Sequence, residues 1–220
     1  MTGASPVRGI GMTSQRTRDR MVARLREQGI RDELVLRAFT GVPRHLFVDP
    51  ALQSRAYEDV ALPIGFEQTI SQPYVVAKML ELVRSGRLIG RALEVGTGCG
   101  YQAALLARLA TEAYSIERIG PLLERARANI RPLHIRNLRF KYGDGFAGLP
   151  EAAPFDAIIV AAAAAEVPGT LVDQLAEEGR MILPVGTVAQ QLILVTRSGG
   201  VVNEVRLDSV RFVPMRAGRE

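Results

Sequence analysis

The spacing of the hydrophobic residues changes near residue 87. Before this point, residues 14–28, 32–41 and 73–86 carry apolar side chains at helical spacing, and each stretch ends at or beside a glycine. After it, short runs that are apolar almost throughout alternate with stretches of helical spacing. The pattern predicts three helices in the first part of the chain, and alternating strands and helices in the second.

Apolar runs of this kind are typical of parallel strands that are covered on both faces of a sheet. The last two runs have no helix between them, and residues 197–200 join them with two consecutive glycines, so an antiparallel hairpin is expected at the sheet edge. We therefore predict an α/β fold with a mostly parallel, doubly wound sheet and a C-terminal antiparallel hairpin. The expected strands lie at residues 91–96, 113–117, 138–142, 155–161, 180–184, 191–196 and 205–213, and the expected helices of this part at 100–110, 121–129 and 168–176.

Residues 43–70 contain three prolines and show no sustained period, so we predict a long irregular stretch. Inside a compact domain such a stretch is usually functional. The expected organisation is a flexible tail at 1–13, an N-terminal helical and substrate-side segment at 14–86, and an α/β core at 87–220. Together these form one compact domain.

Composition limits the class of protein. Hydrophobic residues make up 47% of the 220 residues and charged residues 23%, which is typical of a globular chain. The longest apolar run, residues 157–165, is too short to span a membrane. One cysteine, Cys99, and no signal-peptide pattern favour a cytoplasmic protein without disulfides. His45 and His134 lie far apart, so no metal site is expected.

The net charge of +5 is concentrated at the N-terminus. Residues 1–31 hold seven arginines and two acidic residues, whereas the rest of the chain is balanced. A nucleic-acid partner is one interpretation of such a segment. No aromatic residue is interleaved with these arginines, so we favour a solvated helix face and expect no nucleic-acid partner.

Chemistry is concentrated after the first predicted strand of the core. This strand ends in Glu94-Val-Gly96-Thr-Gly98-Cys-Gly100, and glycines at such a turn let the backbone approach a ligand closely. A dinucleotide-binding loop has its third glycine one residue later, which argues against a nicotinamide cofactor. The spacing suits a ligand without a phosphate at this point, such as an adenosyl group joined to an amino acid.

Two acidic residues mark the carboxyl ends of the next two predicted strands. Glu117 can accept hydrogen bonds from both ribose hydroxyls, and Asp144, in Gly143-Asp-Gly145, can accept from an adenine amino group. Each alone is equally compatible with a charged residue that faces water. Three acidic or glycine-rich strand ends in order, at the edge where such sheets bind ligands, predict an adenosyl-binding site.

The sequence resembles the protein-L-isoaspartate O-methyltransferases from about Arg37 to Met215. The segment Gln68-Thr-Ile-Ser-Gln-Pro-Tyr74 narrows the resemblance to this family, because the glycine loop alone is shared with other methyltransferases. Further matching segments are Val42-Pro-Arg-His-Leu-Phe-Val48, Ala56-Tyr-Glu-Asp59, Leu62-Pro-Ile-Gly65, Leu93-Glu-Val-Gly-Thr-Gly98, Gly100-Tyr-Gln-Ala-Ala104, Ser115-Ile-Glu-Arg118, Phe155-Asp-Ala-Ile-Ile-Val160, Leu183-Pro-Val-Gly186 and Val210-Arg-Phe-Val-Pro214.

The resemblance implies a Rossmann-like class I methyltransferase that uses S-adenosylmethionine. It would esterify the α-carboxyl group of L-isoaspartyl residues in damaged proteins and peptides, and thereby start repair through a succinimide. It implies Ser71 as the catalytic residue, and Thr69, Ile70, Ser71 and Gln72 as substrate-binding residues. The cofactor-binding residues it implies are Glu94, Gly96, Thr97, Gly98, Glu117, Arg118, Asp144 and Gly145.

The expected mechanism is a displacement at a methyl group by a carboxylate that is already ionised near pH 7. It needs alignment but no general base. The Ser71 hydroxyl can donate to the substrate carboxylate, although it could instead cap the helix that follows. Glu67 departs from the family pattern, which often has glycine there, and its charge could repel an anionic substrate.

Several other functions share part of this pattern. A methyltransferase for RNA or a small molecule would carry the same glycine loop, but it would not require Thr69-Ile-Ser-Gln-Pro73. A non-catalytic adenosyl-binding module would keep the loop and lose Ser71. A relative that methylates aspartate in one dedicated peptide is not distinguished by the sequence. A monomer is expected, because there is no sustained heptad pattern.

Overall fold

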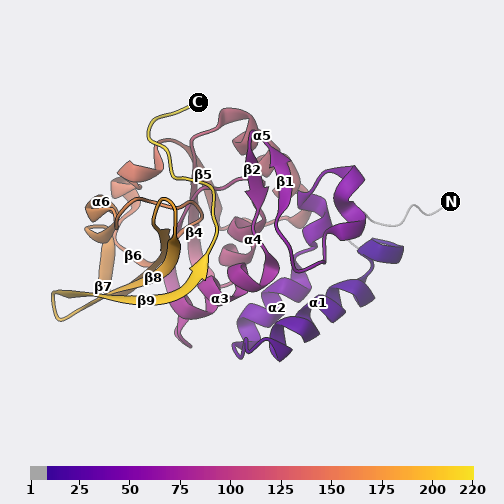
Figure 1. Ribbon diagram of the computed structural model, residues 1–220, viewed down its shortest axis with the longest axis horizontal. Helices are drawn as coiled ribbons and strands as arrows, with labels where there is room; N and C mark the ends of the chain where they lie inside the picture. The colour runs from indigo at the N-terminus through magenta and orange to yellow at the C-terminus, as the bar shows by residue number, and fades with distance from the viewer. Residues whose placement is uncertain (1–8) are drawn as a thin grey trace.

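The computed structural model describes residues 9–220. A seven-stranded sheet runs through the molecule in the order β5-β4-β3-β6-β7-β8-β9 (Figure 1). Neighbours from β5 to β7 pair in parallel, whereas β8 and β9 pair antiparallel. The mostly parallel sheet and the C-terminal hairpin are therefore confirmed. The strands are β3 (Ile89–Val95), β4 (Ala110–Glu117), β5 (Leu138–Tyr142), β6 (Phe155–Val160), β7 (Leu175–Val185), β8 (Gln190–Ser198) and β9 (Val201–Val210).

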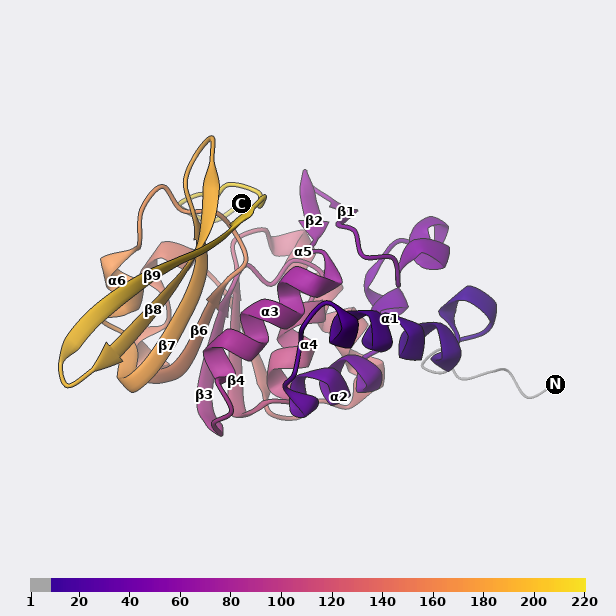
Figure 2. The ribbon, with the colours of Figure 1, turned by 60° about the horizontal axis from the view of Figure 1, so that its bottom comes forward.

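One face of the sheet is covered by the long helices (Figure 2). The helices α3 and α4 contact the strands, and α1 and α2 pack outside them. Alternate residues of β6, such as Ala157 and Ile159, point into the larger hydrophobic core on this face. The helices are α1 (Gln15–Glu27), α2 (Glu33–Gly41), α3 (Pro73–Arg84), α4 (Tyr101–Ala107) and α5 (Gly120–Ile130), with the 3-10 turns η1 (Gly11–Thr13) and η4 (Arg131–Leu133).

The opposite face carries a second core beneath short helices. Ile158 and Val160, the other alternate residues of β6, point into it together with Leu171. The covering elements are α6 (Gly169–Val172) and the 3-10 turns η5 (Gly145–Ala147) and η6 (Pro150–Ala152). Both faces of the sheet are thus covered, but long helices cover only one of them.

Residues 43–70 are more regular than predicted. They form the 3-10 helices η2 (Arg44–Phe47) and η3 (Pro50–Arg55), and an antiparallel hairpin of β1 (Leu62–Gly65) and β2 (Gln68–Ile70). The hairpin turns at Phe66 and Glu67, which have φ of 53° and 56°. Non-glycine residues rarely adopt such angles, so this turn was not evident from the residue types. The prediction of an irregular stretch is wrong here.

Some boundaries also differ. The predicted helix 168–176 shrinks to Gly169–Val172, because Leu175 already pairs with Phe155 as the start of β7. Likewise β4 begins at Ala110, where a helix was expected, because Ala110 pairs with Ile89 of β3. Pairing with a neighbouring strand overrides the local helical spacing at both places.

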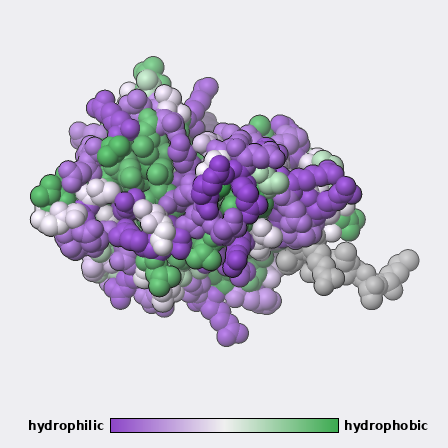
Figure 3. All heavy atoms as spheres, turned by 90° about the horizontal axis from the view of Figure 1, so that it is seen from below, coloured by the Kyte–Doolittle hydropathy of each residue, from purple (hydrophilic) through white to green (hydrophobic). Residues whose placement is uncertain are grey.

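The predicted tail at 1–13 falls mainly outside the described residues, and Gly11–Thr13 form a 3-10 turn. Within residues 9–220, no helix has both the length and the apolar character that crossing a membrane requires. Seen from below, most of the surface is hydrophilic (Figure 3). Exposed apolar side chains of the edge strand β9 include Val201, Val202 and Val205.

Candidate active site

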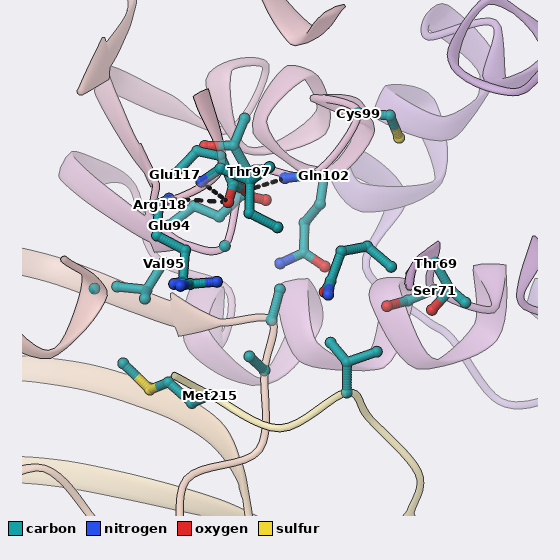
Figure 4. Close-up of a pocket in the computed structure, with 18 of the residues that line it drawn as sticks. Thr69, Ser71, Glu94, Val95, Thr97, Cys99, Gln102, Glu117, Arg118 and Met215 are labelled. Carbon is teal, nitrogen blue, oxygen red and sulfur yellow. Dashed lines mark hydrogen bonds between the residues drawn. The ribbon is translucent and has the colours of Figure 1, made fainter. Parts of the chain in front are cut away.

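A pocket opens at the carboxyl ends of β3 and β4, where they meet the β1–β2 hairpin and the start of α3. Figure 4 shows Thr69 and Ser71 on one side of this pocket and Glu94 and Glu117 on the other, with Gln102 between them. The edge of the sheet is the one where parallel α/β folds bind ligands. Ten of the predicted site residues line this pocket, namely Thr69, Ile70, Ser71, Glu94, Gly96, Thr97, Gly98, Glu117, Arg118 and Gly145.

Two positions of the glycine loop have backbone angles that favour glycine. Gly96 and Gly98 have φ of 92° and 53°, and a Cβ on Gly98 would lie 3.2 Å from Cδ1 of Ile64 in β1. The Gly96 amide donates to the backbone carbonyl of Ile116 at 2.9 Å. The loop is thereby held against β4, and both glycines line the pocket.

Glu94 lies at the bottom of the pocket and is fully buried. Its Oε2 accepts a hydrogen bond from the Ser115 hydroxyl, which also lies 2.6 Å from the hydroxyl of Thr97. Burial raises the pKa of Glu94 to about 8. Its Oε1 has no hydrogen-bond partner among the described residues, so it can pair with a polar group of a ligand.

Glu117 is held by the backbone around it. Its Oε2 accepts from the Gly98 amide at 2.8 Å, and its Oε1 accepts from the amides of Arg118 and Ile119, both at 2.9 Å. These bonds fix the carboxylate beside the glycine loop. Because a carboxylate oxygen can accept two bonds, Oε2 keeps capacity for a ligand hydroxyl.

The predicted adenine side divides into two parts. Gly145 lines the pocket, and a Cβ there would lie 2.4 Å from Cγ1 of Val95. Asp144 is not among the lining residues. Its carboxylate accepts from the Phe146 amide at 2.9 Å, which caps η5, and from the Gly218 amide at 2.7 Å. An adenine contact of Asp144 stays a prediction.

Ser71 lies between β2 and α3. The alternative that it caps α3 is not seen, because the residue at the cap position is Gln72 and no side chain of that position makes the capping bond. No hydrogen bond to the Ser71 hydroxyl is present within the described part of the chain, whereas its backbone carbonyl accepts from Arg44 at 2.8 Å. The hydroxyl is therefore available in the pocket.

A second groove continues from the first at Thr69 and Ser71. Gln72 lines this groove and not the first pocket, and residues 209–213 form its other wall. Glu67 is exposed in the β1–β2 turn and lines neither cavity. The structure thus places the negative charge of Glu67 outside the lining of both cavities.

Comparison with known proteins identifies this arrangement. The family model of protein-L-isoaspartate(D-aspartate) O-methyltransferase matches residues 16–220. The chain belongs to this family. The protein-L-isoaspartate O-methyltransferases of Aromatoleum aromaticum and of Azoarcus sp. strain BH72 are 59% and 62% identical to it. The first alignment covers 96% of this chain and 96% of the relative, and the second covers 93% and 95%.

A solved structure agrees with the sequence relatives. A putative protein-L-isoaspartate O-methyltransferase from Plasmodium falciparum, crystallised with S-adenosyl-L-homocysteine, superposes with a TM-score of 0.78. It is 27% identical, and the match covers 90% of this chain and 98% of that one. The predicted family, fold class, methyltransferase class and S-adenosylmethionine cofactor are confirmed.

Several residues that line the pocket were not predicted. Residues 213–216, which follow β9, line the pocket. Ala163 holds them through two backbone hydrogen bonds of 2.8 Å: its amide donates to the Val213 carbonyl, and its carbonyl accepts from the Met215 amide. Tyr101 belongs both to the core and to the lining of the pocket. It packs edge-on against Phe39 and Phe47. The segment 210–214 was among those that resemble the family, but nothing in the side chains at 213–216 indicates a cofactor.

Proposed function

We propose that this pocket carries out the family's reaction with Ser71 as the residue that orients the substrate. The substrate is the α-carboxylate of an L-isoaspartyl residue in a damaged protein or peptide, and the donor is S-adenosylmethionine. The observation that carries the assignment is the available hydroxyl of Ser71, which lies across one pocket from the unpartnered Oε1 of Glu94 (Figure 4). One side thus offers a donor to an anion, and the other offers an acceptor.

The residues around Glu94 fit the cofactor. Besides Oε1 of Glu94, the Nε2 of Gln102 and the hydroxyl of Tyr101 are buried in the pocket wall without a hydrogen-bond partner among the described residues. Buried polar atoms are normally paired, so three in one pocket suit a ligand that is both polar and partly apolar. We assign Glu94, Gly96, Thr97 and Gly98 to its amino-acid and ribose side, together with Glu117.

The chemistry requires little from the protein beyond position. Bound S-adenosylmethionine supplies a methyl group on a positively charged sulfur. A carboxylate oxygen forms the new bond to carbon as the carbon–sulfur bond breaks, so no proton moves. Ser71 would donate to one carboxylate oxygen and thereby direct the other, and holding the two reactants in line can supply roughly 7 kcal/mol of the barrier. Burial raises the pKa of Cys99 to about 11, so this thiol stays protonated.

The second groove suits an extended peptide. Its walls come from Gln72 and from residues 209–213, and it joins the first pocket at Ser71. The isoaspartyl residue of a bound peptide would enter the first pocket, and its flanking residues would lie in the groove. The backbone nitrogen of the following residue can then attack the carbonyl carbon of the methyl ester and release methanol, which closes the succinimide that starts repair.

We further infer a monomeric, cytoplasmic enzyme without a nucleic-acid or membrane partner. The arginine-rich N-terminus supports this view in part. The guanidinium of Arg24 donates to the carbonyl of Tyr57 at 2.7 Å, and that of Arg18 to the carbonyl of Thr40 at 3.0 Å. Two of these arginines therefore hold backbone of this chain.

Replacement of the Ser71 hydroxyl tests the assignment. A hydrogen bond to a charged group contributes about 1.5–3 kcal/mol, so we expect Ser71→Ala to lower kcat by about tenfold to a hundredfold. Affinity for S-adenosylhomocysteine, measured by calorimetry, should change less than about threefold. Ser85→Ala, at the exposed far end of α3, is the matched control. An unchanged kcat for Ser71→Ala, or lost cofactor binding, would contradict the role of Ser71.

A further inference from the structure

The link between β2 and α3, residues 71–72, carries Ser71 and is held by two charged side chains that line neither cavity. Arg44 bonds to Ser71, and Asp59 bonds to Gln72 and to Tyr74 in the first turn of α3. Neither residue is among those around the pocket or the groove. Any effect they have on the reaction must therefore pass through the residues that they hold.

Arg44 is fully buried and joins three stretches of backbone. Its Nε donates to the carbonyl of Ala56 at 2.9 Å, and its Nη2 donates to that of Ser71 at 2.8 Å, with the Val60 carbonyl farther away at 3.4 Å. Its guanidinium lies 4.9 Å from the centre of the Tyr101 ring. Burial lowers the pKa of Arg44, but a guanidinium keeps its charge in proteins. A buried cation bonded to neutral carbonyls is costly, and the negative charge of Asp59 offsets part of this cost.

Asp59 holds the other side of the link. Its Oδ1 accepts from the Tyr74 amide at 3.0 Å, and its Oδ2 accepts from the side-chain amides of Gln72 at 3.0 Å and Gln28 at 2.8 Å. Burial opposes ionisation of Asp59, but the bonds from Gln28, Gln72 and Tyr74 bring its pKa below the usual value. Because Gln72 makes no capping bond itself, the carboxylate of Asp59 satisfies the start of α3 from outside the helix.

We propose that Arg44 and Asp59 are positioning residues for methyl transfer, which together fix the backbone of Ser71 and its exit into α3. The proposal rests on the assigned role of Ser71. Arg44 fixes the carbonyl of Ser71, and Asp59 fixes the two residues that bracket Pro73. With both in place, the direction of the Ser71 hydroxyl is set before substrate binds, which is the alignment that the reaction needs.

Helix α1 also holds the loop that carries Asp59. Gln28, at the end of α1, donates to Asp59, and Arg24 of α1 donates to the carbonyl of Tyr57, two residues earlier. The loop that carries Asp59 is therefore held against α1 as well as against α3. This gives part of the arginine-rich segment a role in placing Ser71, although it lies far from Ser71 in the sequence.

The test compares Asp59→Ala with Asp49→Ala. Asp49 is the matched control because it also accepts from a backbone amide, that of Ala51 at 2.9 Å, but it caps η3 and makes no bond to the link. Displacement of a reacting group by about 1 Å can cost a hundredfold in rate, so we expect Asp59→Ala to lower kcat for an isoaspartyl peptide by about tenfold or more. Affinity for S-adenosylhomocysteine should stay within about threefold, and Asp49→Ala should keep kcat.

Two further variants separate positioning from folding. Asp59→Asn retains an oxygen for the Tyr74 amide, so it should recover part of kcat. Arg44→Lys replaces a planar fork by a single ammonium, which cannot hold the carbonyls of Ala56 and Ser71 in the same way, and it should lower kcat at unchanged cofactor affinity. Kinetics are measured well below the thermal midpoint of each variant, so that a loss of stability alone leaves kcat unchanged.

A double-mutant cycle tests the positioning role of Asp59 separately from the catalytic role of Ser71. If Asp59 acts through Ser71, adding Asp59→Ala to Ser71→Ala should lower kcat much less than Asp59→Ala does alone. Full additivity, or an unchanged kcat in Asp59→Ala, would overturn the positioning role while leaving Ser71 in place. A Ser71→Ala enzyme with full activity would instead overturn the proposed function.

Discussion

At the residue scale, Glu94 shows how one side chain can serve binding at the expense of stability. It is fully buried, one of its oxygens has no partner among the described residues, and burial raises its pKa to about 8. A carboxyl group in this position would be replaced by an apolar one if folding alone mattered. Its position in the wall of the cofactor pocket gives it a use that folding does not.

The sign of the pH effect follows from the raised pKa of Glu94. The folded chain holds this proton up to about pH 8, whereas the unfolded chain releases it near the ordinary value of 4.5. The unfolded state therefore binds fewer protons in this interval, and the contribution of Glu94 to stability falls as the pH rises through it.

Glu94→Gln should accordingly stabilise the cofactor-free protein in alkaline solution. We expect its thermal midpoint to exceed that of the original chain by a few degrees at about pH 9, and by less at about pH 6. Its affinity for S-adenosylhomocysteine, measured at about pH 9 where the Glu94 carboxyl is ionised, should fall by about tenfold, because a charged acceptor is lost. Glu166→Gln, on the exposed surface, is the control. Equal midpoints for Glu94→Gln and the control at both pH values would contradict this account.

At the scale of elements, the segment after β9 lines the proposed cofactor pocket through long-range contacts. Residues 213–216 line the pocket, and the segment beyond them is bound by Arg118. The Nη1 of Arg118 lies 2.8 Å from Glu220, and its Nε donates to the carbonyl of Gly218 at 3.2 Å. Arg118 was predicted as a cofactor residue, and it also holds this C-terminal segment.

Arg118→Ala should loosen the segment. Hydrogen exchange of the backbone amides of Val213, Met215 and Arg216 should become faster, because one anchor of the segment is lost. The pair is partly exposed and is therefore worth about 1 kcal/mol at most, so the Kd for S-adenosylhomocysteine should rise by no more than about fivefold. Arg127→Ala, which removes the surface ion pair with Glu124, serves as the control. Unchanged exchange at 213–216 would refute the anchoring role.

The elements also show which parts of the fold a sequence can predict. The buried strands β3 and β6 were found within a few residues, because apolar runs flanked by glycine or charge are a strong local signal. The start of β7 at Leu175 was missed, because it depends on pairing with Phe155. The β1–β2 hairpin was missed because its turn uses Phe66 and Glu67 in place of glycine.

The candidate site divides in the same way. Glu94, Gly98 and Glu117 lie at or just after the carboxyl ends of two neighbouring strands, so their meeting in one pocket was predictable from their order. Met215 and Tyr101 were not assigned to the pocket, because nothing in their local sequence says which elements will face them. The contacts of Arg44 and Asp59 with the Ser71 link likewise arise only when residues 44–60 fold over α3.

At the scale of the whole molecule, the sheet and the N-terminal segment have separate tasks. In the proposed mechanism, the carboxyl ends of β3 and β4 supply the acceptors for the cofactor, whereas the link between the β1–β2 hairpin and α3 supplies Ser71. The pocket lies where these two parts meet (Figure 4). This division explains how a methyl donor site common to many methyltransferases is combined with recognition of one type of carboxylate.

The central claim is therefore that the site transfers a methyl group to isoaspartyl carboxylates. The most direct test offers S-adenosylmethionine with a labelled methyl group and two synthetic peptides that differ only in L-isoaspartate against L-aspartate at one position. The account predicts label on the isoaspartyl peptide alone, as an ester that base removes. Label on both peptides, or on neither while S-adenosylhomocysteine still binds, would contradict it.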